Sequence, residues 1–232
     1  HIEKIKGEAL RRMRPQFQMI FQDPYSSLNP RMSVGQIISE GMQAHNMIKK
    51  KDARMQEMVL KIMDDCGLAP YFLHRFPHQF SGGMKQRVVI AIALACHPQL
   101  LIADEPTTAL DVTIQAQVLD LMKNLRKQYQ TSLIMITHDL GIVAEICDEV
   151  AVMYAGNVVE QGTLEDVFNH TMHPYTEGLF NSLPNLKEQG EMLEPIKGLM
   201  PDPADLPPGC TFAPRCPYAT EACSASVPEL HS

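Results

Sequence analysis

Two adjacent carboxylates follow an apolar run in the middle of the sequence. Leu100 to Ala103 is wholly apolar, and Asp104 and Glu105 come directly after it. Such a run predicts a strand buried on both faces of a parallel sheet, and α/β folds bind ligands at the carboxyl ends of such strands. Because neighbouring strand residues point to opposite faces, two roles are natural: Asp104 as a Mg²⁺ ligand and Glu105 as the base that polarises an attacking water. The alternative is a solvated strand end without a ligand.

A histidine follows a second apolar run. Residues 132–137 predict another buried strand, and His138 and Asp139 stand at its end. Since parallel strands end at one edge of a sheet, His138 could contact the same phosphate and water as Glu105. A histidine that only caps the next helix is the plainer interpretation of this residue taken alone.

A serine and two glycines stand at the start of a predicted helix. Ser81, Gly82 and Gly83 precede a helical stretch that runs to Cys96. Exposed backbone N–H groups at a helix start, together with the helix dipole, favour a bound anion there. A flexible helix cap without a ligand is the alternative.

The elements that must position these residues alternate between strands and helices. Strands are predicted at 16–21, 100–103 and 132–137, a loop at 25–30, and helical segments at 33–77, 84–96, 112–127 and 140–147. Residues 150–154 and 158–161 predict a hairpin, and Thr163 is expected to cap a short helix after it. The alternation indicates an α/β fold with a mainly parallel sheet. After about Pro184, many prolines predict an irregular tail.

Composition excludes several classes of function. The chain has 232 residues, 27 acidic against 20 basic residues, and a net charge of −7. This balance argues against a surface built to hold nucleic acid. The longest apolar run, Val88 to Cys96, is shorter than the roughly 20 residues that a membrane-spanning helix needs. We therefore expect a soluble chain whose membrane contact, if any, is peripheral.

Together, the order and spacing of these motifs resemble the nucleotide-binding subunit of ABC transporters, over most of residues 16–162. The matching positions are Gln22 for the Q-loop, Ser81 to Gln86 for the signature motif, Leu101 to Asp104 for Walker B, Glu105 for the catalytic base, Ala109-Leu110-Asp111 for the D-loop and His138 for the switch histidine.

The resemblance implies a P-loop NTPase-like (RecA-like) parallel sheet core with an inserted helical subdomain and an irregular, Pro- and Cys-rich C-terminal tail. It divides the chain into the rest of an N-terminal core with the Q-loop (1–25), the helical subdomain ending in the signature motif (26–91), the RecA-like core with Walker B, D-loop and switch histidine (92–172) and a C-terminal extension (173–232). It also implies ATP and Mg²⁺ as cofactors. The residues implied are Glu105 and His138 for catalysis, Gln22, Ser81, Gly82, Gly83, Gln86, Asp104 and Asp111 for nucleotide binding, and Asp104 and Gln22 for Mg²⁺.

A finer resemblance points to the oligopeptide/dipeptide importer subgroup. It is carried by residues 21–30, residues 104–113 and His173-Pro174-Tyr175-Thr176. It implies an ATP-hydrolysing motor at the cytoplasmic face of the membrane, peripherally bound. The implied partners are a second ABC ATPase subunit in a homo- or heterodimer, two membrane permeases and, indirectly, a peptide-binding protein, with no nucleic acid. The alternatives are an importer for nickel or another small solute, an ABC ATPase of repair or translation, and a non-hydrolytic cassette remnant.

One family motif does not occur in these 232 residues. No Gly-x-x-x-x-Gly-Lys-Ser/Thr is present, although this loop supplies the backbone cradle and the lysine for ATP phosphates. Because Gln22 lies so near the first residue, the resemblance implies an N-terminally truncated subunit. We expect this chain alone to bind ATP weakly or not at all.

Three cysteines gather in the tail. Cys210, Cys216 and Cys223 lie in a proline-rich segment, and three thiolates could hold most of an iron–sulfur cluster. The subgroup commonly carries a fourth cysteine, for which His231 is a possible substitute. The sequence leaves open a 4Fe–4S cluster in the intact protein and three free thiols.

Overall fold

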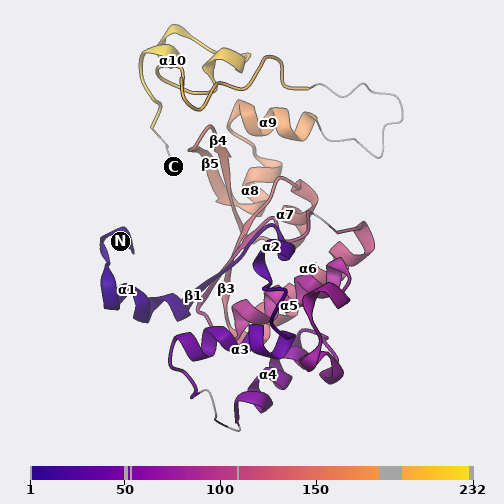
Figure 1. Ribbon diagram of the computed structural model, residues 1–232. Helices are drawn as coiled ribbons and strands as arrows, with labels where there is room; N and C mark the ends of the chain where they lie inside the picture. Colours follow the sequence, from indigo (N-terminus) through magenta and orange to yellow (C-terminus); the bar gives the residue numbers. More distant parts are fainter. Residues whose placement is uncertain (1, 50–51, 53, 109, 183–194, 230–232) are drawn as a thin grey trace. The chain divides into compact units, whose positions relative to one another are not determined.

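The computed structural model describes residues 2–49, 52, 54–108, 110–182 and 195–229 (Figure 1). The chain divides into two compact units, residues 1–146 and residues 147–232. Among the helices of the described residues, none is long and apolar enough to cross a membrane. The division into four functional segments that the sequence predicts stays a prediction.

The first unit contains the expected parallel sheet. Its strands are β1 (Phe17–Ile20), β2 (Leu100–Asp104) and β3 (Ser132–Ile136), in the order β1-β2-β3. Ile20 is paired with Ala103, and Asp104 with Ile136. Because β2 is central, the chain that leaves it lies between the ends of its two neighbours. The three predicted strands are confirmed.

Two helices cover one face of this sheet. They are α5 (Gly82–Leu94) and α6 (Val112–Tyr129). Leu94 of α5 and Leu125 of α6 line one small cavity together with Leu101 and Leu133 of the sheet. The alternate residues Leu101 and Ala103 of β2 are accordingly buried.

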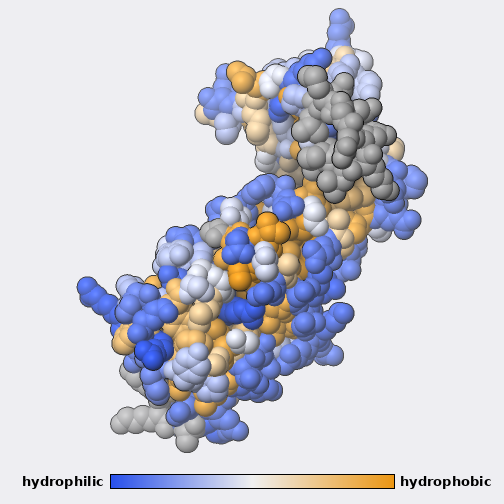
Figure 2. All heavy atoms as spheres, turned by 90° about the vertical axis from the view of Figure 1, so that its right-hand side faces the viewer, coloured by the Kyte–Doolittle hydropathy of each residue, from blue (hydrophilic) through white to orange (hydrophobic). Residues whose placement is uncertain are grey.

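The opposite face of the sheet is only partly covered. Met19, Ile134 and Ile136 are 37%, 49% and 46% exposed. The prediction that 132–137 is a buried strand is therefore wrong, and 100–103 is fully buried on one face only. An apolar run shows which side chains a strand has but not which layers cover them. It therefore could not distinguish a strand covered on both faces from one covered on a single face. Figure 2 shows hydrophobic atoms gathered at the surface of the molecule among hydrophilic ones.

The first unit has further helices. They are the short η1 (Ile2–Lys4), α1 (Gly7–Met13), η2 (Arg14–Gln16), α2 (Pro24–Ser27), α3 (Val34–Ala44), α4 (Arg54–Asp65), η3 (Pro70–His74), η4 (Pro77–Gln79) and α7 (Leu140–Ile146). Of these, α2, α3 and α4 pack against α5. Ser33 and Gln36 form a capping box at the start of α3. The predicted loop at 25–30 is wrong in its first part, because the Asp23 carboxylate caps a single helical turn, α2.

Helices α4 and α6 are joined by one carboxylate. Asp65 at the end of α4 accepts hydrogen bonds from Tyr129 Oη at 2.6 Å and Gln128 Nε2 at 2.9 Å. Burial, reinforced by this bond to Asp65, raises the pKa of the Tyr129 hydroxyl. The phenol therefore stays protonated and can keep donating to Asp65, which ties the helical segment to the sheet's covering layer.

The second unit is built on a hairpin. Strands β4 (Glu149–Tyr154) and β5 (Asn157–Thr163) are antiparallel, and Ala155 and Gly156 at the turn both have positive φ angles, of 45° and 81°. This is the backbone that a two-residue hairpin turn needs. Thr163 caps α8 (Leu164–Asn169), as its spacing to Asp166 predicts. Helix α9 (Pro174–Asn181) follows.

An aromatic cluster anchors the tail to this hairpin. Phe212 is 1% exposed, and its ring contacts those of Tyr154 and Tyr175, with centroids 5.1 and 5.4 Å apart. Arg215 donates to Tyr154 Oη at 3.3 Å and to the Lys197 carbonyl at 3.1 Å. The only helices of the described tail are short, η5 (Ala213–Arg215) and α10 (Glu221–Ala225), so the expected irregular tail is confirmed.

Phe212→Ala should release the tail. Loss of a fully buried phenylalanine costs about 3–5 kcal/mol, and here the cost falls on the contact that anchors residues 195–229. Limited proteolysis of the natural full-length protein should cleave this variant in the tail much faster. Tyr218→Ala, at a tail residue that is 64% exposed, is the matched control. Equal cleavage of the two variants would contradict the anchoring role.

Candidate active site

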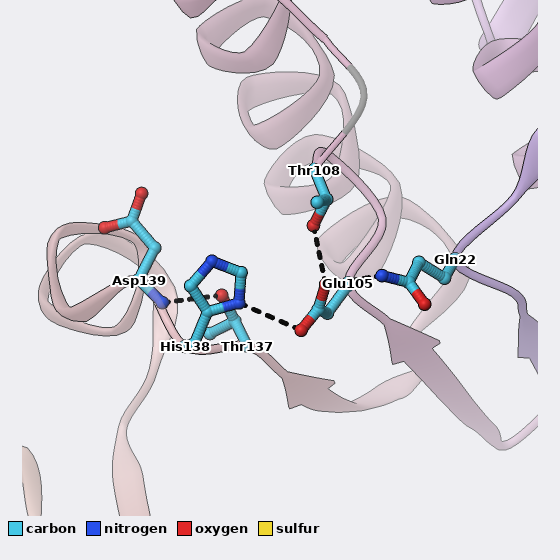
Figure 3. Close-up of polar contacts among 6 residues, drawn as sticks. All are labelled: Gln22, Glu105, Thr108, Thr137, His138 and Asp139. Atoms are coloured by element: carbon cyan, nitrogen blue, oxygen red, sulfur yellow. Dashed lines mark hydrogen bonds and ion pairs between the residues drawn. The ribbon is translucent and has the colours of Figure 1, made fainter.

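Side chains that follow all three parallel strands meet at the carboxyl edge of the sheet (Figure 3). Gln22, after β1, donates from Nε2 to Glu105 Oε2 at 2.8 Å. His138, after β3, has its Nδ1 2.9 Å from Glu105 Oε1. The structure thus brings together Gln22, Glu105 and His138, as the order of the motifs predicts.

The backbone of Glu105 departs from what strand alternation predicts. Strand β2 ends at Asp104, and Glu105 has a φ angle of 43°, in the left-handed region that non-glycine residues rarely adopt. Its N–H still donates to the Ile136 carbonyl at 2.9 Å. Glu105 therefore turns out of the strand instead of pointing to its opposite face, and the fold carries backbone strain at the base of the site.

Hydrogen bonds keep the Glu105 carboxylate ionised. The bond with His138 is the largest cause of a lowered pKa of Glu105, followed by the bond from Thr108, with partial burial acting against them. The Glu105 side chain is 23% exposed and that of His138 73%. An ionised carboxylate that solvent can reach is able to accept a proton from water.

The loop after β3 excludes the plainer interpretation of His138. The Asp139 carboxylate, not the His138 ring, accepts from the first amides of α7, at 2.8 Å from Gly141 N. Thr137 Oγ1 in turn accepts from Asp139 N at 3.1 Å. His138 is therefore left free to contact Glu105, and the helix is capped without it.

Thr108 belongs to this site, and sequence reasoning missed it. Its Oγ1 donates to Glu105 Oε2 at 2.9 Å, beside the amide of Gln22 (Figure 3). The signal available in the sequence was a hydroxyl three residues after the candidate base, on the segment that must turn back from β2. Only the left-handed turn at Glu105 shows that this hydroxyl reaches the Glu105 carboxylate.

The serine and glycines of the signature motif stand where the sequence predicts. Ser81 caps α5, accepting at Oγ from Met84 N at 3.4 Å. A Cβ on Gly83 would clash with Ile114 Cγ2, so this glycine is needed for packing α5 against α6. A Cβ on Gly82 would meet only Leu110, at an ordinary 3.6 Å. Packing among the described residues therefore does not require a glycine at position 82. The missing side chain leaves room for a ligand to approach the backbone there.

The remaining nucleotide-site residues differ in where they lie. Asp111 caps α6, with Oδ1 accepting from Ile114 N at 3.0 Å. Gln86 is only 1% exposed, and its Nε2 has no hydrogen-bond partner among the described residues, so it does not reach the surface as a nucleotide contact would require. Ala109 lies outside the described residues.

The carboxyl edge fits a Mg²⁺ ion in its donor chemistry. The amide nitrogen of Gln22 faces Glu105, and its oxygen is turned away from that carboxylate (Figure 3). Asp104, half-buried at the carboxyl end of β2, supplies a carboxylate at the same edge of the sheet. Mg²⁺ commonly takes one or two protein oxygens and fills its other positions with phosphate and water. Gln22 and Asp104 are the residues that would hold it.

The three tail cysteines do not form a ligand set. Within the described residues, no group of three or more His, Cys, Asp or Glu side chains is arranged to hold a metal ion. Cys210, Cys216 and Cys223 are all free thiols. Cys223 Sγ contacts Thr220 N and Oγ1 instead, at 3.5 and 3.4 Å. The structure gives no support to the 4Fe–4S cluster that the sequence left open.

Comparison with known proteins settles the family. The family described as "ABC transporter" matches residues 1–108, and "Oligopeptide/dipeptide transporter, C-terminal region" matches residues 159–223. The oligopeptide transport ATP-binding protein AppD of Bacillus subtilis is 53% identical over 227 residues, which are 98% of this chain and 67% of AppD. The chain belongs to the ABC transporter ATP-binding family. Members of this family are ATPases, and their cofactors are ATP and Mg²⁺.

Other relatives agree. OppD of Haemophilus influenzae, an oligopeptide transport ATP-binding protein, is 50% identical over 96% of this chain and 67% of its own length. DppD of Bacillus subtilis, a dipeptide transport ATP-binding protein, is 51% identical over 90% of this chain and 63% of its own length. The chain therefore spans about two thirds of the length of the curated relatives it matches.

Solved structures confirm the fold. CbiO1 of Clostridium perfringens, part of the ABC transporter complex cbiONQ, has a TM-score of 0.63 and 33% identity, covering 71% of this chain and 63% of CbiO1. The ATP-binding cassette MJ0796, a dimer bound to ADP and Pi, has a TM-score of 0.60 at 24% identity, covering 69% of this chain and 68% of MJ0796. The second likeness bears on the fold alone.

The strain at Glu105 predicts that a glycine variant is more stable than an alanine variant, the reverse of the usual order. Both Glu105→Gly and Glu105→Ala lose the carboxylate, but only glycine adopts a φ of 43° without cost. Glu105→Gly should unfold roughly 2–4 °C above Glu105→Ala in a thermal melt. An alanine variant as stable as the glycine variant would show that the turn carries no strain.

Thr108 should affect hydrolysis through its hydroxyl. Thr108→Val keeps the shape and removes the donor, and we expect the kcat of the full-length ATPase to fall about 3- to 10-fold, the worth of one hydrogen bond. Thr108→Ser retains the donor and should stay near normal. If serine and valine lower phosphate release equally, the hydroxyl is not what matters at this position.

Proposed function

We propose that this chain is the motor part of an ABC importer for oligopeptides or dipeptides, coupling ATP hydrolysis to transport. The observation that carries the proposal is the contact of Glu105 with Gln22 and His138 at the carboxyl edge of the sheet. The similarity of residues 159–223 to the C-terminal region of oligopeptide/dipeptide transporters supports the cargo class. AppD, OppD and DppD are oligopeptide or dipeptide transport ATP-binding proteins, which favours peptides over nickel or another small solute.

In this proposal, Glu105 activates the attacking water. Its carboxylate is ionised and reachable, so it orients a water for in-line attack on the terminal phosphate and accepts the proton. His138 holds the Glu105 carboxylate from one side and steadies the γ-phosphate. Gln22 and Asp104 would hold Mg²⁺, which would supply positive charge to the phosphates of ATP when bound.

The signature motif would serve a composite site. The start of α5 at Ser81 and Gly82 offers backbone N–H groups and a helix dipole to a phosphate. We assign these groups to ATP that a second ABC ATPase subunit also holds, with Asp111 near that interface. In this assembly the subunit binds peripherally at the cytoplasmic face of the membrane. Its other partners are two membrane permeases and, indirectly, a peptide-binding protein.

Glu105→Gln should abolish hydrolysis and spare binding. The amide keeps the size of the side chain but is no base, so we expect steady-state phosphate release by the natural full-length protein to fall about 100-fold or more. The affinity for ATP should remain within about threefold, because hydrolysis alone needs the base.

A matched control and a cargo test complete this experiment. Glu145→Gln changes a half-exposed glutamate of α7 that pairs with Lys123, outside the site, and should hydrolyse ATP normally. With its permeases and binding protein in vesicles, the normal protein should be stimulated by short peptides and not by nickel chelates. Near-normal phosphate release by Glu105→Gln would overturn the proposed mechanism, and stimulation by nickel alone would overturn the proposed cargo.

A further inference from the structure

The single turn of helix after Gln22 is fixed firmly to it. Asp23 Oδ1 accepts from Tyr25 N at 2.8 Å, and its Oδ2 accepts from Ser26 N at 3.2 Å. Ser27 Oγ donates back to the Asp23 carbonyl at 2.8 Å. These bonds, led by that from Tyr25, lower the pKa of Asp23 and keep its carboxylate charged as a cap. Helix α2 therefore moves with Gln22.

The ring carried by this turn lies against the signature helix. Lys85, in the first turn of α5, is only 9% exposed, and its Nζ lies 3.8 Å from the centroid of the Tyr25 ring. Within the described residues, no carboxylate pairs with this ammonium. A cation over an aromatic face at this distance is attracted by the ring's quadrupole, and more strongly when the cation is desolvated.

The contact differs from ordinary core packing. Tyr25 is 60% exposed, so its ring closes over a buried charge instead of filling the hydrophobic core. Separation of α2 from α5 would leave the Lys85 ammonium without that partner, which is costly for a buried charge. The contact therefore resists relative movement of the two helices.

We propose that Tyr25 and Lys85 are positioning residues that set the start of the signature helix relative to Gln22 and Glu105. One path of contacts runs from Glu105 through Gln22 and α2 to Tyr25, and from Lys85 to Ser81 and Gly82. A shift of Gln22 when nucleotide binds is passed along this path to the groups that meet the phosphate held by the second subunit. The proposal deepens the proposed function and rests on it for its kinetic consequence.

Kinetics of the natural full-length ATPase test this link with matched variants. Tyr25→Leu and Lys85→Met should each lower kcat about fivefold and leave KM for ATP unchanged. The double variant should be no slower than either single variant. Tyr25→Phe and Lys85→Arg, which keep the ring and the cation, should restore normal rates. Tyr71→Leu, which removes another exposed tyrosine (66% exposed), is the control for general destabilisation.

Hydrogen exchange supplies a readout that does not need hydrolysis. Tyr25→Leu should speed exchange at residues 81–86, and Lys85→Met should speed it at residues 22–27, across the contact. Tyr25→Phe and Tyr71→Leu should change neither segment.

The outcomes separate the two proposals. Single-variant effects that multiply to about 25-fold in the double variant, or unchanged exchange across the contact, would overturn the link while leaving the ATPase function standing. A normal full-length protein that does not hydrolyse ATP would overturn the proposed function, and hydrogen exchange would still decide whether the link exists.

Discussion

Parallel strands end at one edge of their sheet, and in this chain everything proposed for the site depends on that edge being in register. Ile20, Ala103 and Met135 stand side by side across β1, β2 and β3, so Gln22 and His138 leave their strands on either side of Glu105. The Glu105 amide, bonded to the Ile136 carbonyl, extends this register by one residue. A shift of one residue in any strand would move these side chains away from one another.

The helix that covers the sheet is also the helix that carries the signature motif. Gly83 brings α5 close enough to α6 to touch Ile114, and Arg87 donates to the Cys66 carbonyl at 3.0 Å, fixing the end of α4. The contacts that bury α5 therefore also position Ser81 and Gly82 at its start. The bond from Tyr129 to Asp65 then joins the helical segment to the same layer.

Most of the fold, and the core of the site, could be predicted from the sequence. Apolar runs marked the strands, and polar residues directly after them marked the edge where Gln22, Glu105 and His138 meet. The left-handed backbone of Glu105 could not be predicted, because a glutamate gives no sequence signal for a positive φ angle. The contact between Thr108 and Glu105 depends on that turn, so it could not be predicted either. The exposure of Ile134 and Ile136 depends on the layers packed around β3.

Other misses have the same origin in packing. Gln86 belongs to a motif that resembles a binding loop, yet helix periodicity turns it into the interior. For the tail cysteines the sequence left a cluster and free thiols open, and spacing alone could not show that Cys223 Sγ contacts Thr220. The cap that makes α2 a helix, and with it the contact between Tyr25 and Lys85, depends on the orientation of a single aspartate side chain.

The central claim is that the effect of His138 on hydrolysis comes mainly from its contact with Glu105 and only in small part from its contact with the γ-phosphate. The most direct measurement is the single-turnover rate of hydrolysis of prebound ATP in the full-length protein, with His138→Ala introduced alone and together with Glu105→Gln. The account predicts that His138→Ala slows the normal protein strongly and slows the Glu105→Gln protein little further, since both changes disable one step. Slowing by the same factor in both backgrounds would show that His138 and Glu105 act independently, and would contradict the account.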